Sequence, residues 1–341
     1  MATTLVVRFS SLGDVAILIP VLYSVAIKNP EDKFLLITKS PFASIFVNKP
    51  VNLEVIPVYT NAQHKGINGL CKLVRELNPK RIDKVADLHD VLRSQQLDIY
   101  FRLKGKKVAV INKGRKEKKA LARRNNKEFQ PLKTSIERYQ EVFRQLGYDA
   151  SLDFKSLFTS VNRDFTSIEP LVGTKEGNWI GIAPFAKHLG KTYPKEQMEE
   201  IIRLLSEKPA VRLFLFGGKE DKEQLETWVN KYKQVQSVAG CFSFPEELLL
   251  MSYMDVLLSM DSGNMHLASL VGVPVVSVWG ATHPYAGFYG YNQNPVNIVQ
   301  LDMKCRPCSI FGNKPCYRGD YACMKGITPE SVVRQIDANL R

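Results

Sequence analysis

Short apolar runs alternate with longer helix-period segments along the whole chain. Each run spans five to seven residues rich in Val, Ile, Leu and Phe, which is typical of strands buried on both faces of a parallel sheet. The segments between them are long enough for crossover helices. The pattern occurs twice, on either side of an irregular stretch at 150–178. The expected strands lie at 4–9, 34–38, 53–58, 84–88 and 107–111, and at 179–184, 211–217, 235–239, 255–259 and 275–280.

This doubled pattern predicts an α/β protein with two tandem Rossmann-like, doubly wound parallel-sheet domains and an interdomain cleft. The length of 341 residues also favours two domains, because one core usually stops growing at ~250–300 residues. We expect an N-terminal domain at 1–155, a linker at 156–178 and a C-terminal domain at 179–325. The segment 326–341 begins a helix at Thr-Pro-Glu, and one placement that we consider for it is back against the N-terminal domain.

Positive charge is concentrated in one segment. The chain has a formal net charge of +13, and residues 102–127 contain twelve Lys or Arg and a single acid, Glu117. This favours a local anionic partner, with a solvated charge run as the alternative. The N-terminus lacks the features of a secretory signal, and the apolar stretch at 15–27 is shorter than the ~20 residues that span a bilayer. We therefore expect a cytoplasmic protein.

Polar residues follow the first expected strand, at the position where open α/β sheets bind ligands. Ser10, Ser11 and Gly13 lead into Asp14, which opens a helix. One interpretation is that Asp14 only offsets the helix dipole. The other is that its carboxylate accepts a proton from a substrate hydroxyl as a general base.

Two strand ends in the second half carry residues suited to an anion. Lys191 precedes a helix expected near Pro194, where a cation opposes the helix dipole unless an anion lies between them. Ser262 and Gly263 can present a hydroxyl and backbone amides at a helix start, with His266 one turn along. The alternatives are a solvated basic loop and a structural histidine. If the site is functional, His266 should lie within reach of the anion and not be buried against the neighbouring strand.

Two further features are open to more than one interpretation. The strand end at Gly217 and Gly218, followed by Glu220 and Asp221, is either an ordinary turn or a place where a nucleoside ribose meets a carboxylate. Four cysteines near the C-terminus begin with a C-x-x-C spacing, which is compatible with structural zinc or with free or partly oxidised thiols; elemental analysis distinguishes the two. They are Cys305, Cys308, Cys316 and Cys323.

Together these residues resemble glycosyltransferase family 9, the bacterial lipopolysaccharide heptosyltransferases and their relatives. The resemblance covers nearly the whole chain. It implies a GT-B fold with the acceptor in the N-terminal domain and the donor nucleotide in the C-terminal domain. It also implies inverting, metal-independent hexosyl or heptosyl transfer, typically of heptose from ADP-heptose to a Kdo-lipid A type inner core. The motifs that carry it are RFSSLGDVAILIP at 8–20, VADLHDVLRS at 85–94, KTYP at 191–194, FGGKED at 216–221, DSGNMHLASLVGVPVVSVWGAT at 261–282 and the cysteine pattern before GITPESV at 326–332.

The resemblance assigns roles to residues of this chain. Asp14 takes the position of the general base. The donor diphosphate and sugar fall to Lys191, Asp261, Ser262, Gly263 and His266. The nucleoside falls to Gly217, Gly218, Glu220 and Asp221. For the acceptor, Ser10, Ser11 and Gly13 adjoin Asp14, and our hypothesis from the concentration of positive charge adds Arg93, Lys116, Lys118 and Lys119. No metal or further cofactor is implied for catalysis. Ser262 and Asn264 stand where Thr and Pro are usual in the family, and Ser262 preserves the hydroxyl. His89, in the acceptor domain, stands where Gln is usual, so the identity of the acceptor is more open than the reaction.

The expected partners follow from these assignments. They are a nucleotide-sugar donor and an anionic glycolipid acceptor bound by the basic segment, with peripheral contact at the inner face of the inner membrane. Nucleic acid is not expected, because only Phe101 at the edge of the basic run could stack on a base. The alternatives are transfer from another nucleotide sugar in surface glycan synthesis, a sugar epimerase of similar architecture and a non-enzymatic polyanion-binding protein.

Overall fold

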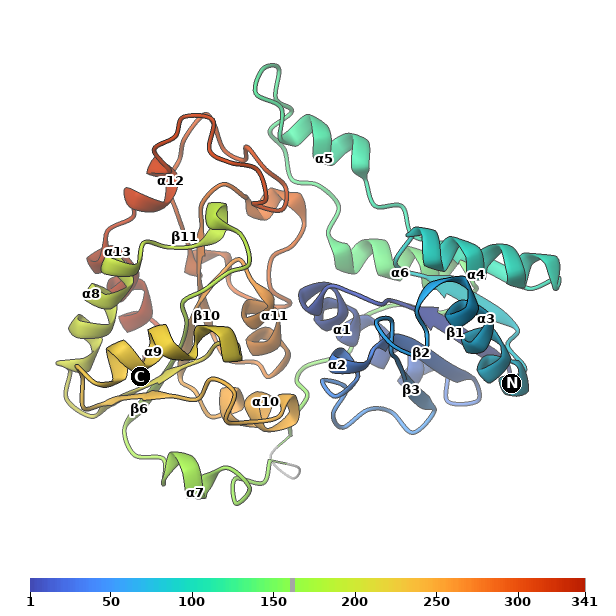
Figure 1. Ribbon diagram of the computed structural model, residues 1–341, viewed down its shortest axis with the longest axis horizontal. Helices are drawn as coiled ribbons and strands as arrows, with labels where there is room; N and C mark the ends of the chain where they lie inside the picture. Colours follow the sequence, from blue (N-terminus) through green and yellow to red (C-terminus); the bar gives the residue numbers. More distant parts are fainter. Residues whose placement is uncertain (160–162, 341) are drawn as a thin grey trace. The chain divides into compact units, whose positions relative to one another are not determined.

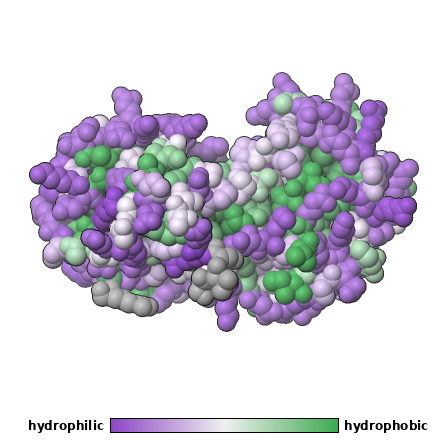
Figure 2. Space-filling view, turned by 90° about the horizontal axis from the view of Figure 1, so that it is seen from below, coloured by the Kyte–Doolittle hydropathy of each residue, from purple (hydrophilic) through white to green (hydrophobic). Residues whose placement is uncertain are grey.

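The computed structural model describes residues 1–159 and 163–340, which form two compact units. The first unit contains residues 1–114 and 133–155, and the second contains 115–132 and the chain from 156 onward. Each unit is a parallel sheet with helices on both faces (Figure 1). The visible surface is largely hydrophilic, with apolar side chains in small patches (Figure 2). Within the described part of the chain, no helix is long and apolar enough to cross a membrane.

The first unit has a five-stranded sheet in the order β3-β2-β1-β4-β5. Its α1 packs against α6, while α3 and α4 contribute Leu73, Leu97 and other apolar side chains to the core on one face of the sheet. The strands are β1 (Thr3–Val7), β2 (Lys33–Lys39), β3 (Leu53–Val58), β4 (Lys84–Asp87) and β5 (Lys107–Val110). The helices are α1 (Leu12–Lys28), α2 (Ser40–Ala43), α3 (Gly66–Leu77), η1 (Asn78–Lys80), α4 (Leu92–Leu103) and α6 (Ser135–Gln145).

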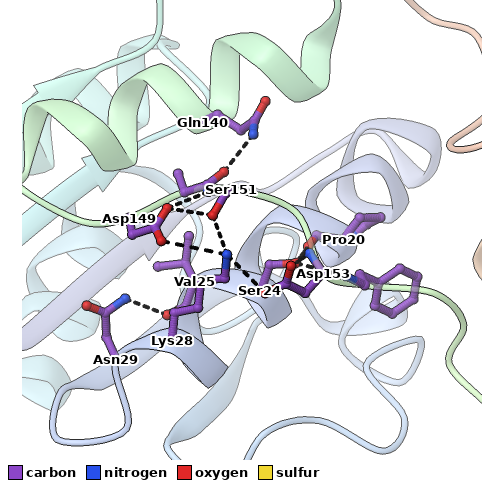
Figure 3. Close-up of polar contacts among 11 residues, drawn as sticks. Pro20, Ser24, Val25, Lys28, Asn29, Gln140, Asp149, Ser151 and Asp153 are labelled. Atoms are coloured by element: carbon purple, nitrogen blue, oxygen red, sulfur yellow. Dashed lines mark hydrogen bonds and ion pairs between the residues drawn. The ribbon is translucent and has the colours of Figure 1, made fainter.

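Hydrogen bonds and an ion pair hold the segment that follows α6 against α1. Every residue from Val15 to Ala26 is buried, as expected for a helix that is apolar all round. Ser24 Oγ accepts the backbone N–H groups of Asp153 and Phe154, at 3.0 and 3.1 Å. Lys28 pairs with Asp153 at 2.9 Å (Figure 3). These contacts hold the first unit together where the chain leaves it.

The second unit has a six-stranded sheet in the order β11-β10-β9-β6-β7-β8. Its strands are β6 (Asn178–Ala183), β7 (Val211–Leu215), β8 (Val235–Ser237), β9 (Val256–Met260), β10 (Val275–Trp279) and β11 (Ile298–Gln300). Its helices are α5 (Arg115–Leu121), α7 (Glu169–Val172), η2 (Leu189–Lys191), α8 (Lys195–Ser206), η3 (Lys219–Asp221), α9 (Lys222–Val229), α10 (Phe244–Ser252), α11 (Gly263–Leu270), η4 (Pro284–Ala286), η5 (Pro295–Asn297), α12 (Ala322–Lys325) and α13 (Pro329–Asp337).

All ten expected strands are present, with ends within two residues of the predicted ones. The expected terminal helix is α13, capped by Thr328, whose hydroxyl accepts from Ser331 N–H at 3.3 Å. The placement of this helix on the N-terminal domain is wrong. It packs against α8 in the second unit, where Val332 and Ile336 are fully buried in the core. The apolar face of α13 is therefore covered by the sheet nearest to it in sequence.

The expected boundary at 155 misses an excursion of the chain. Residues 115–132 belong to the second unit although the chain on both sides belongs to the first. Lys127 anchors them by donating to the carbonyls of Cys305, Arg306 and Pro307, at 3.0, 2.7 and 3.0 Å. The Lys118 ammonium lies 4.4 Å from the ring centre of Phe288. Half of the basic segment is thus part of the second unit.

Candidate functional site

Both sheets have a topological switch point, where the connections that follow two neighbouring strands lead toward opposite edges of the sheet. In the first unit this point lies between β1 and β4, and in the second between β6 and β9. Crevices at the carboxyl ends of such strands are where open α/β sheets bind ligands. The polar residues singled out by the sequence follow β1 in the first unit and β6 and β9 in the second.

Asp14 is held at the end of β1 through one carboxylate oxygen. Its Oδ2 accepts from Ser11 N–H at 3.1 Å and from Ser11 Oγ at 2.8 Å, and it pairs with Arg8 Nη2 at 2.6 Å. Within residues 1–159 and 163–340 no hydrogen bond or ion pair to Oδ1 is found. The side chain is 26% exposed. Asp14 therefore caps α1, as the simpler interpretation expects, and still presents an oxygen for another contact.

The charge of Asp14 is stabilised by the same partners. Burial would raise the pKa of the carboxyl, but the Arg8 guanidinium and the two Ser11 donors lower it below its ordinary value. The group is therefore ionised at neutral pH and able to accept a proton. Arg8 is itself nearly buried and donates to the carbonyl of Leu88 at 2.6 Å, so it connects the ends of β1 and β4.

His89 faces this arrangement from the end of β4. Its Nδ1 accepts from Phe9 N–H at 3.3 Å. Burial, together with the charges of Arg8 and Lys113, lowers the pKa of His89 to about 3. The ring is therefore neutral at pH 7, and because Nδ1 is an acceptor the proton is on Nε2. His89 can donate one hydrogen bond from Nε2 to a ligand oxygen.

Two buried carboxyl groups, those of Asp87 and Asp98, interact near His89. Asp87 Oδ1 accepts from the N–H groups of His89 and Asp90, at 2.7 and 3.0 Å. Its Oδ2 and the Oδ1 of Asp98 have no hydrogen-bond partner among the described residues. Burial and the neighbouring Asp87 raise the pKa of Asp98 to about 8. The Asp98 carboxyl therefore keeps its proton to higher pH, and in that form it can donate a hydrogen bond to Asp87.

In the second unit Lys191 and Asp261 form an ion pair at the switch point. Lys191 Nζ lies 2.8 Å from Asp261 Oδ2, and the two side chains are 17% and 5% exposed. The stem of Lys191 lies against Gly312, which has a φ of +73° and where a Cβ atom would approach Lys191 Cγ to 2.6 Å. Glycine at this position is thus required both by the backbone and by the close approach of the lysine.

The short helix α11 begins directly after Asp261. Ser262 is its N-cap, and its hydroxyl lies 3.2 Å from that of Ser259. Gly263 provides the first helical N–H, which points out of the helix start. His266 is only 6% exposed, so the expectation that it would not be buried is wrong. All residues from Met265 to Leu270 are buried, because this small helix packs against both β9 and β10.

The turn after β7 uses its two carboxylates differently. Asp221 Oδ2 accepts from Gly218 N–H at 2.8 Å and so holds the turn closed. Glu220 is exposed, and its carboxylate lies over Gly218, where a Cβ atom would approach Oε2 to 2.4 Å. Gly217 is crowded in the same way by Asp221. The structure thus gives Asp221 a structural role and leaves Glu220 at the surface of the turn.

The residues expected to bind the acceptor are divided between the two units. Ser10, Ser11 and Gly13 adjoin Asp14 in the chain, whereas Arg93 donates to the carbonyl of His64 at 2.5 Å and braces the loop before α3. Lys116, Lys118 and Lys119 lie on α5 in the second unit.

The four C-terminal cysteines are free thiols that line one small cavity together with Arg318 and Asp320. Within the described parts of the chain, no group of three or more His, Cys, Asp or Glu side chains is arranged to hold a metal ion. Elemental analysis of the purified protein distinguishes zinc from free thiols. The loop is held by Arg306, which is 3% exposed and donates to the carbonyls of Gly280 and Thr282, at 2.5 and 3.0 Å.

Sequence reasoning overlooked Arg8 and Arg306. For Arg8 a signal was available, since it is the only charged residue within the apolar run 4–9, and a cation in a buried strand needs a partner. For Arg306 the sequence offers no comparable signal, because the carbonyls of Gly280 and Thr282 that it binds lie 26 and 24 residues away in the chain.

Two Rossmann-like parallel-sheet units are the architecture of the GT-B fold, which the solved heptosyltransferases of Escherichia coli share. The model of glycosyltransferase family 9 (heptosyltransferase) matches residues 70–314. The chain belongs to this family and is a glycosyltransferase.

Named relatives and solved structures match this chain over nearly its full length. Lipopolysaccharide heptosyltransferase 1 of Campylobacter coli is 25% identical over 97% of each chain. The protein of that name from Pseudomonas aeruginosa is 26% identical over 98% of this chain and 97% of its own. The family 9 glycosyl transferase of Veillonella parvula superimposes with a TM-score of 0.78 at 20% identity, covering 99% and 97% of the chains. ADP-heptose lps heptosyltransferase II of Escherichia coli gives 0.73 at 18%, covering 99% and 98%. These structural matches establish the fold.

Proposed function

We propose that this enzyme transfers a heptose from ADP-heptose, with inversion, to an anionic glycolipid acceptor of the lipopolysaccharide inner core, of the Kdo-lipid A type. Its family and the names of its full-length relatives support the sugar and the pathway. The observation that carries the mechanism is the Asp14 carboxylate, with one oxygen anchored by Arg8 and Ser11 and the other open.

In this proposal Asp14 acts on the acceptor. Its open oxygen accepts the proton of the acceptor hydroxyl as that oxygen forms a bond to the anomeric carbon. The bond from the anomeric carbon to the diphosphate breaks in the same step, so ADP leaves with the bonding electron pair. The Nε2–H of His89 would donate to an acceptor oxygen and help to orient it. Ser10, Ser11 and Gly13 form the adjoining backbone.

The second unit would hold the donor. Lys191 and the amides at the start of α11 offer positive charge to the diphosphate, whose charge grows as it leaves. Asp261 orients the lysine through their ion pair. Ser262 adds a hydroxyl and Gly263 an amide, while His266 supports the helix from within. Glu220 is the carboxylate that we assign to the ribose, with Gly217, Gly218 and Asp221 shaping the turn.

The membrane is the remaining partner in this proposal. A glycolipid acceptor is anchored in a bilayer, so the enzyme would act at the inner face of the inner membrane by peripheral contact. Transfer from another nucleotide sugar is the second candidate, because the contacts at α11 recognise phosphate and not the identity of the sugar.

Substitution of Asp14 tests the proposed base. Asp14→Asn should reduce turnover of ADP-heptose by at least a hundredfold, on the order of what a general base contributes, while donor binding persists. The thermal shift with ADP-heptose measures that binding, because a ligand stabilises the fold by RT ln(1 + [L]/Kd).

Asp149→Asn is the matched control, since Asp149 is an exposed carboxylate of the same unit that pairs with Lys28; it should retain full activity. Near-normal turnover in Asp14→Asn would remove Asp14 as the base. A larger thermal shift with another nucleotide sugar than with ADP-heptose would replace the donor and leave the base assignment intact.

A further inference from the structure

Helix α4 presents a row of apolar side chains to solvent. Leu92, Ile99 and Leu103 are 74%, 58% and 83% exposed. Their spacing of seven and four residues places them along one line of the helix. We call these three residues the α4 stripe. The buried residues Ser94, Leu97, Asp98 and Phe101 lie on the opposite side. The packing of the unit therefore explains one apolar face of α4 and leaves the other without a role.

Cations flank this row. At about 100° per residue, Arg102 lies to one side of the α4 stripe and Lys104 to the other, and both are exposed. Lys107 follows beyond the turn at Gly105 and is also exposed. The only acid within α4 is Asp98, which is 3% exposed. The outer surface of this helix thus combines exposed apolar side chains with positive charge and no acidic residue.

This combination fits the surface of an anionic lipid bilayer. A helix that lies in a bilayer interface buries apolar side chains at the boundary between headgroups and acyl chains, while flanking Lys and Arg residues contact anionic headgroups. Single exposed apolar residues are common on protein surfaces, but three in line between cations match the apolar and charged character of that boundary. A second copy of this chain would bring the same cations face to face, which opposes self-association through this surface.

We propose that the α4 stripe and its flanking cations dock the protein on anionic membranes. Leu92, Ile99 and Leu103 enter the headgroup region, and Arg102 and Lys104 bind the lipid phosphates. Docking is a property of the first unit that requires neither donor nor turnover. It can therefore hold or fail independently of the proposed reaction.

Vesicle co-sedimentation tests the proposal with the full-length protein. The probes are vesicles of phosphatidylcholine alone and of phosphatidylcholine with one quarter phosphatidylglycerol. The wild type should bind the anionic vesicles and bind the neutral ones at least tenfold more weakly. The triple variant Leu92→Gln, Ile99→Gln and Leu103→Gln should lose about tenfold or more in affinity for the anionic vesicles, since the burial of three apolar side chains is removed.

Two further variants separate the contributions. Arg102→Gln with Lys104→Gln should weaken binding to anionic vesicles and reduce its dependence on salt. The matched control replaces three exposed apolar residues elsewhere, Ile27→Gln, Val51→Gln and Val296→Gln, which are 61%, 104% and 69% exposed. It should bind as the wild type does. Thermal unfolding checks that every variant is folded.

An independent readout reports insertion. Ile99→Trp should show a blue shift of its emission on anionic vesicles, and Val51→Trp should show none.

Activity on a soluble, delipidated acceptor should be unchanged in the triple variant, whereas loss of the proposed function would appear as inactivity of the wild type on that acceptor. Wild-type binding that the triple variant retains would overturn the proposal. So would an effect of the triple variant on self-association alone, measured by analytical ultracentrifugation.

Discussion

The chemistry of Asp14 depends on Arg8, a charged residue at the end of an apolar strand. The guanidinium is 2.6 Å from Asp14 Oδ2 and is almost excluded from solvent. An opposite charge at this distance keeps a carboxylate ionised. Arg8 therefore fixes both the position and the protonation state of the proposed base, although it leaves one oxygen of that base open.

Removal of the Arg8 charge should shift the pH dependence of turnover. Arg8 lowers the pKa of Asp14, so Arg8→Met raises that pKa and the carboxylate becomes protonated at higher pH. The acid limb of the kcat profile should move upward by on the order of one pH unit or more. Arg8→Lys, which retains a cation, should move it less. An unshifted acid limb in a folded Arg8→Met variant would show that Asp14 does not limit the rate.

At this scale the sequence predicted which strand ends carry polar residues but not how those residues pair. Asp14 and Lys191 were each identified from a strand end, because that position has a general meaning in α/β folds, whereas Asp261 was identified from the family resemblance. The burial of His266 was not foreseen, since it depends on how tightly α11 fits between β9 and β10. The roles of Glu220 and Asp221 could be separated only once the turn was seen to use Asp221.

The elements were predicted more completely than their termini and caps. Ten strands were expected because each is an apolar run of sufficient length, and all ten form. β11 was missed, since Ile298–Gln300 is only three residues long and half-buried. The rule that parallel crossovers are right-handed limits the possible strand orders. In the observed order both switch points lie beside strands whose ends the sequence had already singled out.

The contact between β4 and α4 makes stability depend on pH. The pKa of Asp98 is raised to about 8 by burial and by Asp87, so the folded protein binds this proton more tightly than the unfolded chain does. The stabilisation that protonated Asp98 gives the folded protein is fully present below about pH 4, the ordinary pKa of aspartate. It is lost as the pH rises toward 8. Asp98→Asn mimics the protonated form and should lack this dependence.

Equilibrium urea unfolding at pH 5 to 9 measures this effect. The free energy of unfolding of Asp98→Asn should increase relative to that of the wild type as the pH rises across this range. Asp149→Asn serves as the control: hydrogen bonds from Ser151 lower the pKa of Asp149, so its stability difference from the wild type should stay constant. A constant difference for Asp98→Asn as well would show that the pKa of Asp98 is not raised in the folded protein.

At the scale of the whole molecule, the chain does not divide at one point. Residues 115–132 leave the first unit at Gly114, whose φ is +61° and where a Cβ atom would lie 2.3 Å from Arg138 Nη2. No pattern of apolar residues predicts such an excursion, because it is fixed by the contacts of Lys127 and Leu132 with distant loops. The strong concentration of charge at 102–127 was visible in the sequence, but its division between the two units was not.

The part of this charge on α5 should act on the acceptor and not on the donor. Lys116 and Lys119 are exposed and Lys118 is half-buried, and an inner-core glycolipid carries phosphate and carboxylate groups that such cations attract. Replacing Lys116, Lys118 and Lys119 by Gln should raise the acceptor KM several-fold more than the donor KM. The effect should diminish as salt is added.

The control for this change in net charge replaces Lys49, Lys233 and Lys325, which are exposed elsewhere on the protein, by Gln. It removes the same three charges and should leave both KM values within about twofold of the wild type, because exposed charges beyond a Debye length are screened. Steady-state kinetics with each substrate varied in turn gives both constants. Equal increases in the two KM values for the α5 variant would mean that these lysines act through overall charge or folding, and the acceptor would then have to be bound by the cations of the first unit.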